Sequence, residues 1–141
     1  MNALFRLFFS RILKVRLEEI SRRFGKVSFV PVPPRPGKIK KEGWDQIEEL
    51  SLFLEHRYGF SIDRILGRKS SVQQKTLDRD GRLKTIGSSY FVKDEFSSVP
   101  ERICVIDDVM TTGATLEGIA DVLKEKGAKE VFAVTLFTVD S

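Results

Sequence analysis

Residues 103–128, ICVIDDVMTTGATLEGIADVLKEKGA, constrain the fold more than any other part of the chain. Four apolar residues lead directly into Asp107 and Asp108, and a threonine-rich turn then precedes an amphipathic helical pattern. A second apolar run, VFAVTLF, follows at residues 131–137. Strand, helix and strand with continuous apolar strands predict a parallel sheet with right-handed crossovers. We therefore expect an α/β fold, with a parallel sheet flanked by helices.

The length of 141 residues, of which 41% are hydrophobic, is enough for one core and short for two. We expect a single domain over residues 1–141, with an N-terminal amphipathic helix at about 3–24 and a core at about 27–138. The apolar spacing assigns the inward face of that helix to Leu4, Phe8, Ile12, Leu13, Leu17, Ile20 and Phe24. A core-packing helix is preferred over a basic helix lying on a membrane surface.

The remaining elements follow from periodicity and from the positions of proline and glycine. The expected strands are 26–32, 61–66, 102–107 and 131–137. One expected helix, 42–59, has Trp44, Ile47, Leu50 and Leu54 on one face, and a second, about 115–126, has Leu116, Ile119, Ala120 and Leu123 inward. Prolines 31, 33, 34 and 36 predict a stiff loop, and residues 67–90 predict a long exposed loop with at most a weak hairpin.

The surplus of positive charge lies in the N-terminal part of the chain. Residues 1–43 contain eleven Lys or Arg and three Glu. This balance suits phosphorylated ligands, nucleic acid or an acidic partner equally well. The one cysteine, Cys104, excludes an internal disulfide and is expected in the core, so cytoplasm is the natural compartment. No apolar run approaches transmembrane length, and we expect no membrane span.

The two acids and the turn after them have complementary chemistry. Ligands of open parallel sheets bind beyond the carboxyl ends of the strands, and a helix N-terminus favours phosphate. Gly113 lets the backbone come close, while the hydroxyls of Thr111, Thr112 and Thr115 can donate to phosphate oxygens. Carboxylates would repel that phosphate, so their targets are sugar hydroxyls or a metal ion. The alternative, a strand end with a simple helix cap, does not require a second acid.

Three segments resemble a known family. CVIDDVMTTGAT resembles the phosphoribosyl pyrophosphate (PRPP) signature of the type I phosphoribosyltransferases. PVPPRPGKIKKEGWDQ, residues 31–46, is similar to the proline-rich loop of ComF-type competence proteins, and RKSSVQQKTLDRDGR resembles their mobile loop. The resemblance covers roughly residues 27–138.

The resemblance implies roles for particular residues. Asp107 and Asp108 would bind the ribose hydroxyls of PRPP or a nucleoside monophosphate during displacement of pyrophosphate at the anomeric carbon. Magnesium would be held mainly by the ligand, with these two acids as its candidate protein ligands. The other implied site residues are Thr111, Thr112, Gly113, Ala114 and Thr115 for the 5′-phosphate, Pro34, Arg35, Lys38 and Lys40 for pyrophosphate, and Arg68, Lys69, Gln74 and Arg82 in the mobile loop.

The sequence also departs from the ComF pattern. Glu42 and Asp45 stand where an arginine and an asparagine are common, and an asparagine expected near Thr85 is absent. With one cysteine in the sequence, we expect no cysteine-rich zinc module of the kind often found in ComF-like chains. Three hypotheses remain open: a phosphoribosyltransferase, a competence accessory protein that meets DNA-uptake proteins or nucleic acid, and a PRPP-sensing regulator without catalysis. A homodimer is also left open.

Two residues receive a structural interpretation. His56 is expected on the surface near a helix end, although a catalytic base role is the alternative. Trp44 is expected to anchor its helix in the core and not to stack on a base. The basic loop 67–84 has no aromatic residues alternating with its charges, which disfavours single-strand binding.

Overall fold

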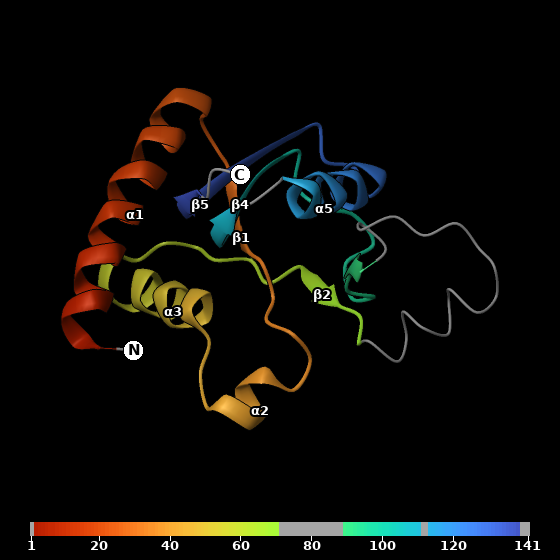
Figure 1. The fold of residues 1–141 in the computed structure, drawn as a ribbon. Coiled ribbons are helices and arrows are strands. Elements are labelled where there is room, and N and C mark those ends of the chain that lie inside the picture. The colour runs from red at the N-terminus through yellow and green to blue at the C-terminus, as the bar shows by residue number, and fades with distance from the viewer. Residues whose placement is uncertain (1, 71–88, 111–112, 139–141) are drawn as a thin grey trace.

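The computed structural model describes residues 2–70, 89–110 and 113–138. The expected α/β fold is confirmed, and Figure 1 shows helices on both sides of a small sheet. The helices are α1 (Ala3–Phe24), α2 (Lys38–Glu42), α3 (Gln46–Tyr58) and α5 (Ala114–Glu125). The strands are β1 (Ser28–Pro31), β2 (Leu66–Arg68), β3 (Tyr90–Val92), β4 (Arg102–Met110) and β5 (Glu130–Thr138).

The central sheet is parallel and has the order β1-β4-β5. Side chains of β4 alternate between its two faces, as a strand buried on both sides requires. Cys104 and Ile106 pack with α1 and α3, whereas Ile103 and Val105 pack with α5. Each face therefore has its own hydrophobic core, and β4 contributes to both.

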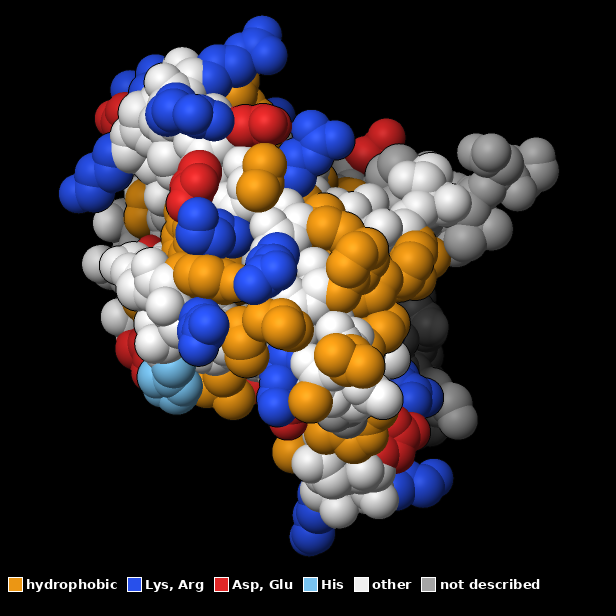
Figure 2. Space-filling model, turned by 90° about the vertical axis from the view of Figure 1, so that its left-hand side faces the viewer, with side chains coloured by type: hydrophobic (Ala, Val, Ile, Leu, Met, Phe, Trp, Pro, Cys, Tyr) orange, Lys and Arg blue, Asp and Glu red, His pale blue; other side chains and the backbone are white. Residues whose placement is uncertain are grey.

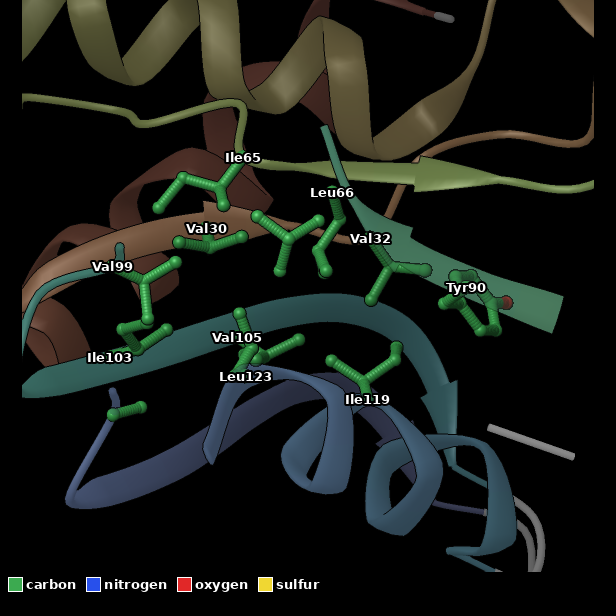
Figure 3. Packing of buried hydrophobic residues seen from close by; sticks show 12 residues of the cluster. Val30, Val32, Ile65, Leu66, Tyr90, Val99, Ile103, Val105, Ile119 and Leu123 are labelled. Atoms are coloured by element: carbon green, nitrogen blue, oxygen red, sulfur yellow. The ribbon is translucent and has the colours of Figure 1, made fainter. Parts of the chain in front are cut away.

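An antiparallel pair, β2 and β3, covers part of the α5 face. Figure 3 shows Leu66 and Tyr90 from this pair in the same cluster as Val105 of β4 and Ile119 of α5. This pair joins the two boundaries of the segment 67–90, and the weak hairpin expected within that segment stays a prediction. Residues 71–88 lie outside the described part of the chain.

The assigned inward face of α1 is wrong in part. Leu4, Phe8 and Ile12 are 76%, 60% and 42% exposed, whereas Leu13 and Leu17 are buried against α3 and the sheet. The helix carries apolar residues on two stripes, and only one of them can face the core. It is nevertheless a core-packing helix, as expected. Within the described residues, no helix is long and apolar enough to cross a membrane.

The expected helix 42–59 begins only at Gln46, as α3, and a separate short helix, α2, occupies Lys38–Glu42 before a break. Gly37 and Gly43 adopt the left-handed conformation on either side of α2 (φ 82° and 87°), which glycine tolerates best. The Asp45 side chain then caps α3 by accepting from the Glu48 amide at 3.1 Å. Trp44 lies in the break and is 36% exposed, so its expected role as a core anchor is wrong.

Strand boundaries differ from expectation in three places. The strand expected at 26–32 is limited to Ser28–Pro31, and that expected at 61–66 is reduced to a single parallel bridge between Phe29 and Ile62. Strand β4 continues three residues past Asp107, because its edge toward β5 remains paired as far as Met110. The helix near 115–126 and the strand near 131–137 are confirmed within one residue at each end.

Arg64 fixes α3 relative to the segment that follows β1. Its guanidinium contacts Glu48 at 2.8 Å and Glu55 at 2.7 Å, two acids separated by two turns of α3. The hydrogen bond from Arg64 lowers the pKa of the Glu55 carboxyl. This bridge holds the N-terminal end of α3, where Asp45 lies.

Candidate functional site

The crevice between β1 and β4 lies at the point where the strand order reverses. β1 is bridged to Ile62 on one side and paired with β4 on the other. The last link between them is the bond from the Val32 amide to the Ile106 carbonyl, at 2.9 Å. Such a switch point is where ligands of open α/β sheets bind. Asp107 and Asp108 follow this last link directly, so they mark the end of β1–β4 pairing and not the end of β4.

The two acids differ in environment. Asp107 is half-buried, and its Oδ1 accepts from the Asp108 amide at 2.8 Å, while Asp108 Oδ1 accepts from the Val109 amide at 2.8 Å. Burial raises the pKa of Asp107 from its ordinary value of 3.8 to about 6, and the negative charges of Asp108 and Asp45 add to the rise. Asp107 is therefore poised to lose its charge in mildly acidic solution.

This shift predicts a pH dependence of stability. Because the folded state holds the Asp107 proton more tightly than the unfolded state, the free energy of unfolding falls as pH rises from about 4 to about 6. Asp107→Asn should therefore stabilise the ligand-free protein at pH 8 and not at pH 4. We expect a difference of about 1 to 2 kcal/mol, allowing for solvent screening. Urea unfolding at both pH values measures it, and an equal effect of the substitution at both would contradict it.

The turn predicted to hold phosphate, residues 111–115, is described from Gly113 onward. Gly113 is left-handed (φ 81°) and begins α5, where its carbonyl accepts from the Glu117 amide at 2.9 Å. Ala114 and Thr115 occupy the first turn of this twelve-residue helix and are half-buried. Thr111 and Thr112 lie outside the described residues. The N-terminus of α5 thus follows β4 on the side where the two acids lie.

The proline-rich loop lies across the crevice. A pocket of about 140 Å³ brings Asp108 together with residues from the loop, α3 and β2. Its lining consists of Val32, Pro33, Pro34, Arg35, Lys38, Asp45, Ile47, Arg68 and Asp108. The other lining residues lie 40 to 76 positions before Asp108 in the sequence, so only the fold brings them together with it. The family resemblance assigns five of these residues to one ligand: Asp108, Pro34, Arg35, Lys38 and Arg68.

A larger hollow of about 460 Å³ adjoins this pocket and shares Arg35, Lys38 and Arg68 with it. Lys41, Lys69 and Glu42 also line the hollow, so its charged lining is five cations and one acid. Such a surface suits a multiply charged anion. Lys40, which was assigned to the same loop, is exposed on α2 and lines neither space among the described residues. Gln74 and Arg82 lie outside the described residues.

The two acids that depart from the ComF pattern each pair with a cation of the loop. Lys38 Nζ lies 2.8 Å from Asp45 Oδ1 and 2.9 Å from Gln46 Oε1, and the Lys38–Asp45 pair is largely buried. Arg35 lies 3.5 Å from Glu42, in an exposed pair. Asp45 therefore competes with a bound anion for Lys38 more strongly than Glu42 competes for Arg35, since exposed ion pairs contribute little.

Tyr90 is a site residue that sequence reasoning missed. It is buried at the end of the core cluster near the carboxyl end of β4 (Figure 3), and the Arg68 guanidinium lies over its ring at 5.4 Å. Burial raises the pKa of the Tyr90 hydroxyl, and the charge of Asp107 adds to this. The ring therefore packs against Arg68, which lines both spaces. The sequence signal that could have identified Tyr90 is its position as the first, aromatic residue of the apolar run YFV that follows the basic loop.

Comparisons with known proteins agree with this geometry. The phosphoribosyl transferase domain family matches residues 47–141. Competence protein ComFC of Streptococcus pneumoniae is 30% identical over 120 residues, covering 85% of this chain and 52% of the relative. Competence protein F of Haemophilus influenzae is 31% identical over 109 residues, covering 74% and 47%. The chain thus spans about half the length of these curated relatives.

Solved structures support the fold alone. A hypoxanthine phosphoribosyltransferase from Staphylococcus aureus superposes with a TM-score of 0.51 at 19% identity, covering 94% of this chain and 64% of that one. A Trypanosoma cruzi hypoxanthine phosphoribosyl transferase gives 0.50 at 10% identity, covering 96% and 74%. The similarity inferred from the sequence is confirmed, and the chain belongs to the phosphoribosyl transferase domain family.

Proposed function

We propose that this protein binds PRPP or a nucleoside 5′-phosphate in the β1–β4 crevice and transfers phosphoribose with release of pyrophosphate. The observation that carries the proposal is the pocket in which Asp108 meets Arg35, Lys38 and Arg68. A carboxylate that can accept from sugar hydroxyls thereby adjoins cations that can hold phosphate. Few ligands other than a phosphorylated sugar with a second anionic group would bind both the carboxylate and the cations.

We infer one orientation for the ligand. Its 5′-phosphate would lie at the N-terminus of α5, where the backbone at Gly113 and the helix dipole favour an anion. Its ribose hydroxyls would donate to Asp107 and Asp108. The pyrophosphate group would then extend from the anomeric carbon into the basic hollow beside Arg35 and Arg68.

The reaction breaks the bond between the anomeric carbon and a pyrophosphate oxygen and forms a bond from that carbon to an acceptor nitrogen. Positive charge develops on the ribose ring, and the leaving group keeps the electron pair. The protein orients the two reactants and neutralises the leaving anion. Arg35, Lys38 and Arg68 are placed for the second task, once Lys38 is released from Asp45.

Magnesium fits the available donors only as a ligand-borne ion. Among the described residues, no cluster of three or more acids, histidines or cysteines could hold a metal. Mg²⁺ commonly binds one or two carboxylates and completes its shell with water and substrate phosphates. Asp107 and Asp108 would supply those carboxylates, and the ion would neutralise charge on the leaving pyrophosphate.

The test separates binding from turnover. Calorimetry with PRPP and magnesium is expected to show saturable binding, and pyrophosphate release should be measured over a panel of bases and amines. Release that depends on one acceptor supports the enzyme. Absence of PRPP binding and of nucleoside monophosphate binding would contradict the proposal as a whole.

A second candidate is a PRPP-binding competence accessory or regulator without catalysis. It is favoured by the two loop cations that already have acidic partners, Arg35 with Glu42 and Lys38 with Asp45, and by the competence names of the two relatives. Its partners would be DNA-uptake proteins or nucleic acid. Tight PRPP binding without pyrophosphate release from any acceptor would support this candidate over the enzyme.

A further inference from the structure

Strand β5 has one edge that no described strand pairs with. Within the described residues this nine-residue strand pairs with β4 alone, and none of its side chains is fully buried. Positions 131–138 contain no charged residue and no proline. Natural edge strands usually carry such residues, because an unprotected apolar edge readily pairs with another strand. This edge is therefore suited to accept one.

Helix α1 runs along β5 in the opposite direction and forms the wall of a groove. The rings of Phe24 and Phe132 are 4.3 Å apart near one end, and those of Phe9 and Phe137 are 5.3 Å apart near the other. Next to this second end, α1 exposes a stripe that consists of Leu4, Phe5, Phe8, Ile12 and Val15. Figure 2 shows hydrophobic side chains gathered on this side of the molecule with Lys and Arg among them.

The other end of the groove is basic. A hollow of about 390 Å³ lies between α1 and residues 133–135 of β5, and its charged lining is Arg16, Arg23 and Glu19. Helix α1 has six basic and two acidic residues, a net +4, and the whole chain has the same net charge. Helix α1 thus carries a charge surplus as large as that of the whole chain, and Arg16 and Arg23 bring part of it to the groove.

We propose that the groove binds an extended, acidic and apolar segment of another protein, which adds as a strand to the free edge of β5. Backbone bonds to the edge would give affinity. Apolar side chains of the segment would cover the stripe near Phe8 and Phe137, and its acidic residues would lie beside Arg16 and Arg23. The groove shares no lining residue with the crevice, so this inference is independent of the proposed ligand chemistry.

A second copy of the chain fits this surface less well. Antiparallel pairing of two β5 edges about a two-fold axis would place the apolar end of one groove against the basic end of the other. It would also bring two α1 helices together, each with a net charge of +4. Like charges so placed repel, whereas an acidic segment is attracted.

The probe is a labelled ten-residue synthetic peptide with three acidic residues, then alternating valine and threonine, and a terminal phenylalanine. The reversed sequence is tested as well, because an added strand can run either way. We expect at least one direction to raise fluorescence anisotropy at low salt and to shift the amide resonances of residues 131–138. Arg16→Glu with Arg23→Glu should weaken this binding at least tenfold, and Phe137→Lys should remove it.

The matched control is Arg57→Glu with Lys124→Glu, two charge reversals in the last turns of α3 and α5 that should leave binding within twofold. Circular dichroism establishes that each variant is folded. The proposal is overturned if neither peptide binds, if a peptide with lysine in place of the acids binds as well, or if resonances shift only outside β5.

Two further measurements address other occupants. Phosphatidylserine vesicles that bind the protein through Arg16 and Arg23, with no binding of either peptide, would overturn the proposal in favour of a membrane surface. Sedimentation that reveals a dimer, dissociated by Phe137→Lys, would overturn it in favour of a second copy. A monomer that does not bind vesicles but binds the acidic peptide is the expected result.

Discussion

Replacing Asp107 and Asp108 together by asparagine is expected to weaken PRPP binding by more than a hundredfold at pH 8. Both carboxylates lie at the mouth of the β1–β4 crevice, and Asp107 is half-buried there. Hydrogen bonds to charged groups contribute ~1.5 to 3 kcal/mol each, so loss of two amounts to about 3 kcal/mol or more. Asparagine is close in size and keeps an oxygen for the Asp108 and Val109 amides, so the fold should survive.

The measurement is isothermal titration with PRPP and magnesium. Alkaline solution is needed because burial raises the pKa of Asp107 to about 6, and a proton would mask the effect of the substitution in acid. The matched control, Asp94→Asn with Asp121→Asn, removes the same charge from two exposed positions. If the double variant in the crevice binds PRPP as tightly as this control, the ribose assignment is wrong.

The part of the fold that the sequence predicts best is local. For β4, α5 and β5, apolar runs, helical spacing and glycine positions all agree, and the observed ends differ from the expected ones by one residue for α5 and β5 and by three at the end of β4. The inward face of α1 was not predictable in the same way. Leu4 and Leu17 are equally apolar, and only the docking of α3 and β5 decides that Leu17 is buried and Leu4 exposed.

The same division holds within the candidate site. Asp107, Asp108 and Gly113 could be predicted as site residues from the sequence, because they belong to one contiguous pattern. The ion pair between Lys38 and Asp45 could not be predicted in this way. The two residues are seven positions apart across a helix and a break, and the pair forms only when α3 begins at Gln46. Tyr90 follows Arg68 by 22 positions in the sequence, so the contact between the two could not be predicted without knowing that β2 pairs with β3.

In the proposed binding mode, ligand capture and leaving-group stabilisation would depend on different parts of the crevice. The acids and the start of α5 would hold the ribose and its 5′-phosphate. The pyrophosphate side would need Lys38, whose ammonium contacts Asp45 and Gln46. Asp45 also lines the pocket itself, where its charge opposes an incoming anion. Asp45 is therefore the residue that best distinguishes an enzyme from a binding protein.

Asp45→Asn is accordingly expected to tighten binding of pyrophosphate and PRPP by about ten- to a hundredfold at low salt. At an effective dielectric constant near 20, a like-charge pair ~6 Å apart costs about 3 kcal/mol, and the substitution removes that repulsion while freeing Lys38. Asparagine caps helices as well as aspartate does, so α3 should keep its start. Glu42→Arg should have a smaller effect, since the Arg35–Glu42 pair is exposed and screened.

Titration calorimetry with pyrophosphate, followed by assays of pyrophosphate release from PRPP, measures both consequences of Asp45→Asn. Glu49→Gln is the matched control, because it removes one negative charge from the same helix at a residue paired with Arg6, outside the pocket. Tighter binding together with new turnover would show that Asp45 restrains a competent transferase. Tighter binding without turnover would favour the regulator. If Asp45→Asn binds pyrophosphate no better than Glu49→Gln, Lys38 does not contact the leaving group, and the proline-rich loop must be withdrawn as the pyrophosphate site.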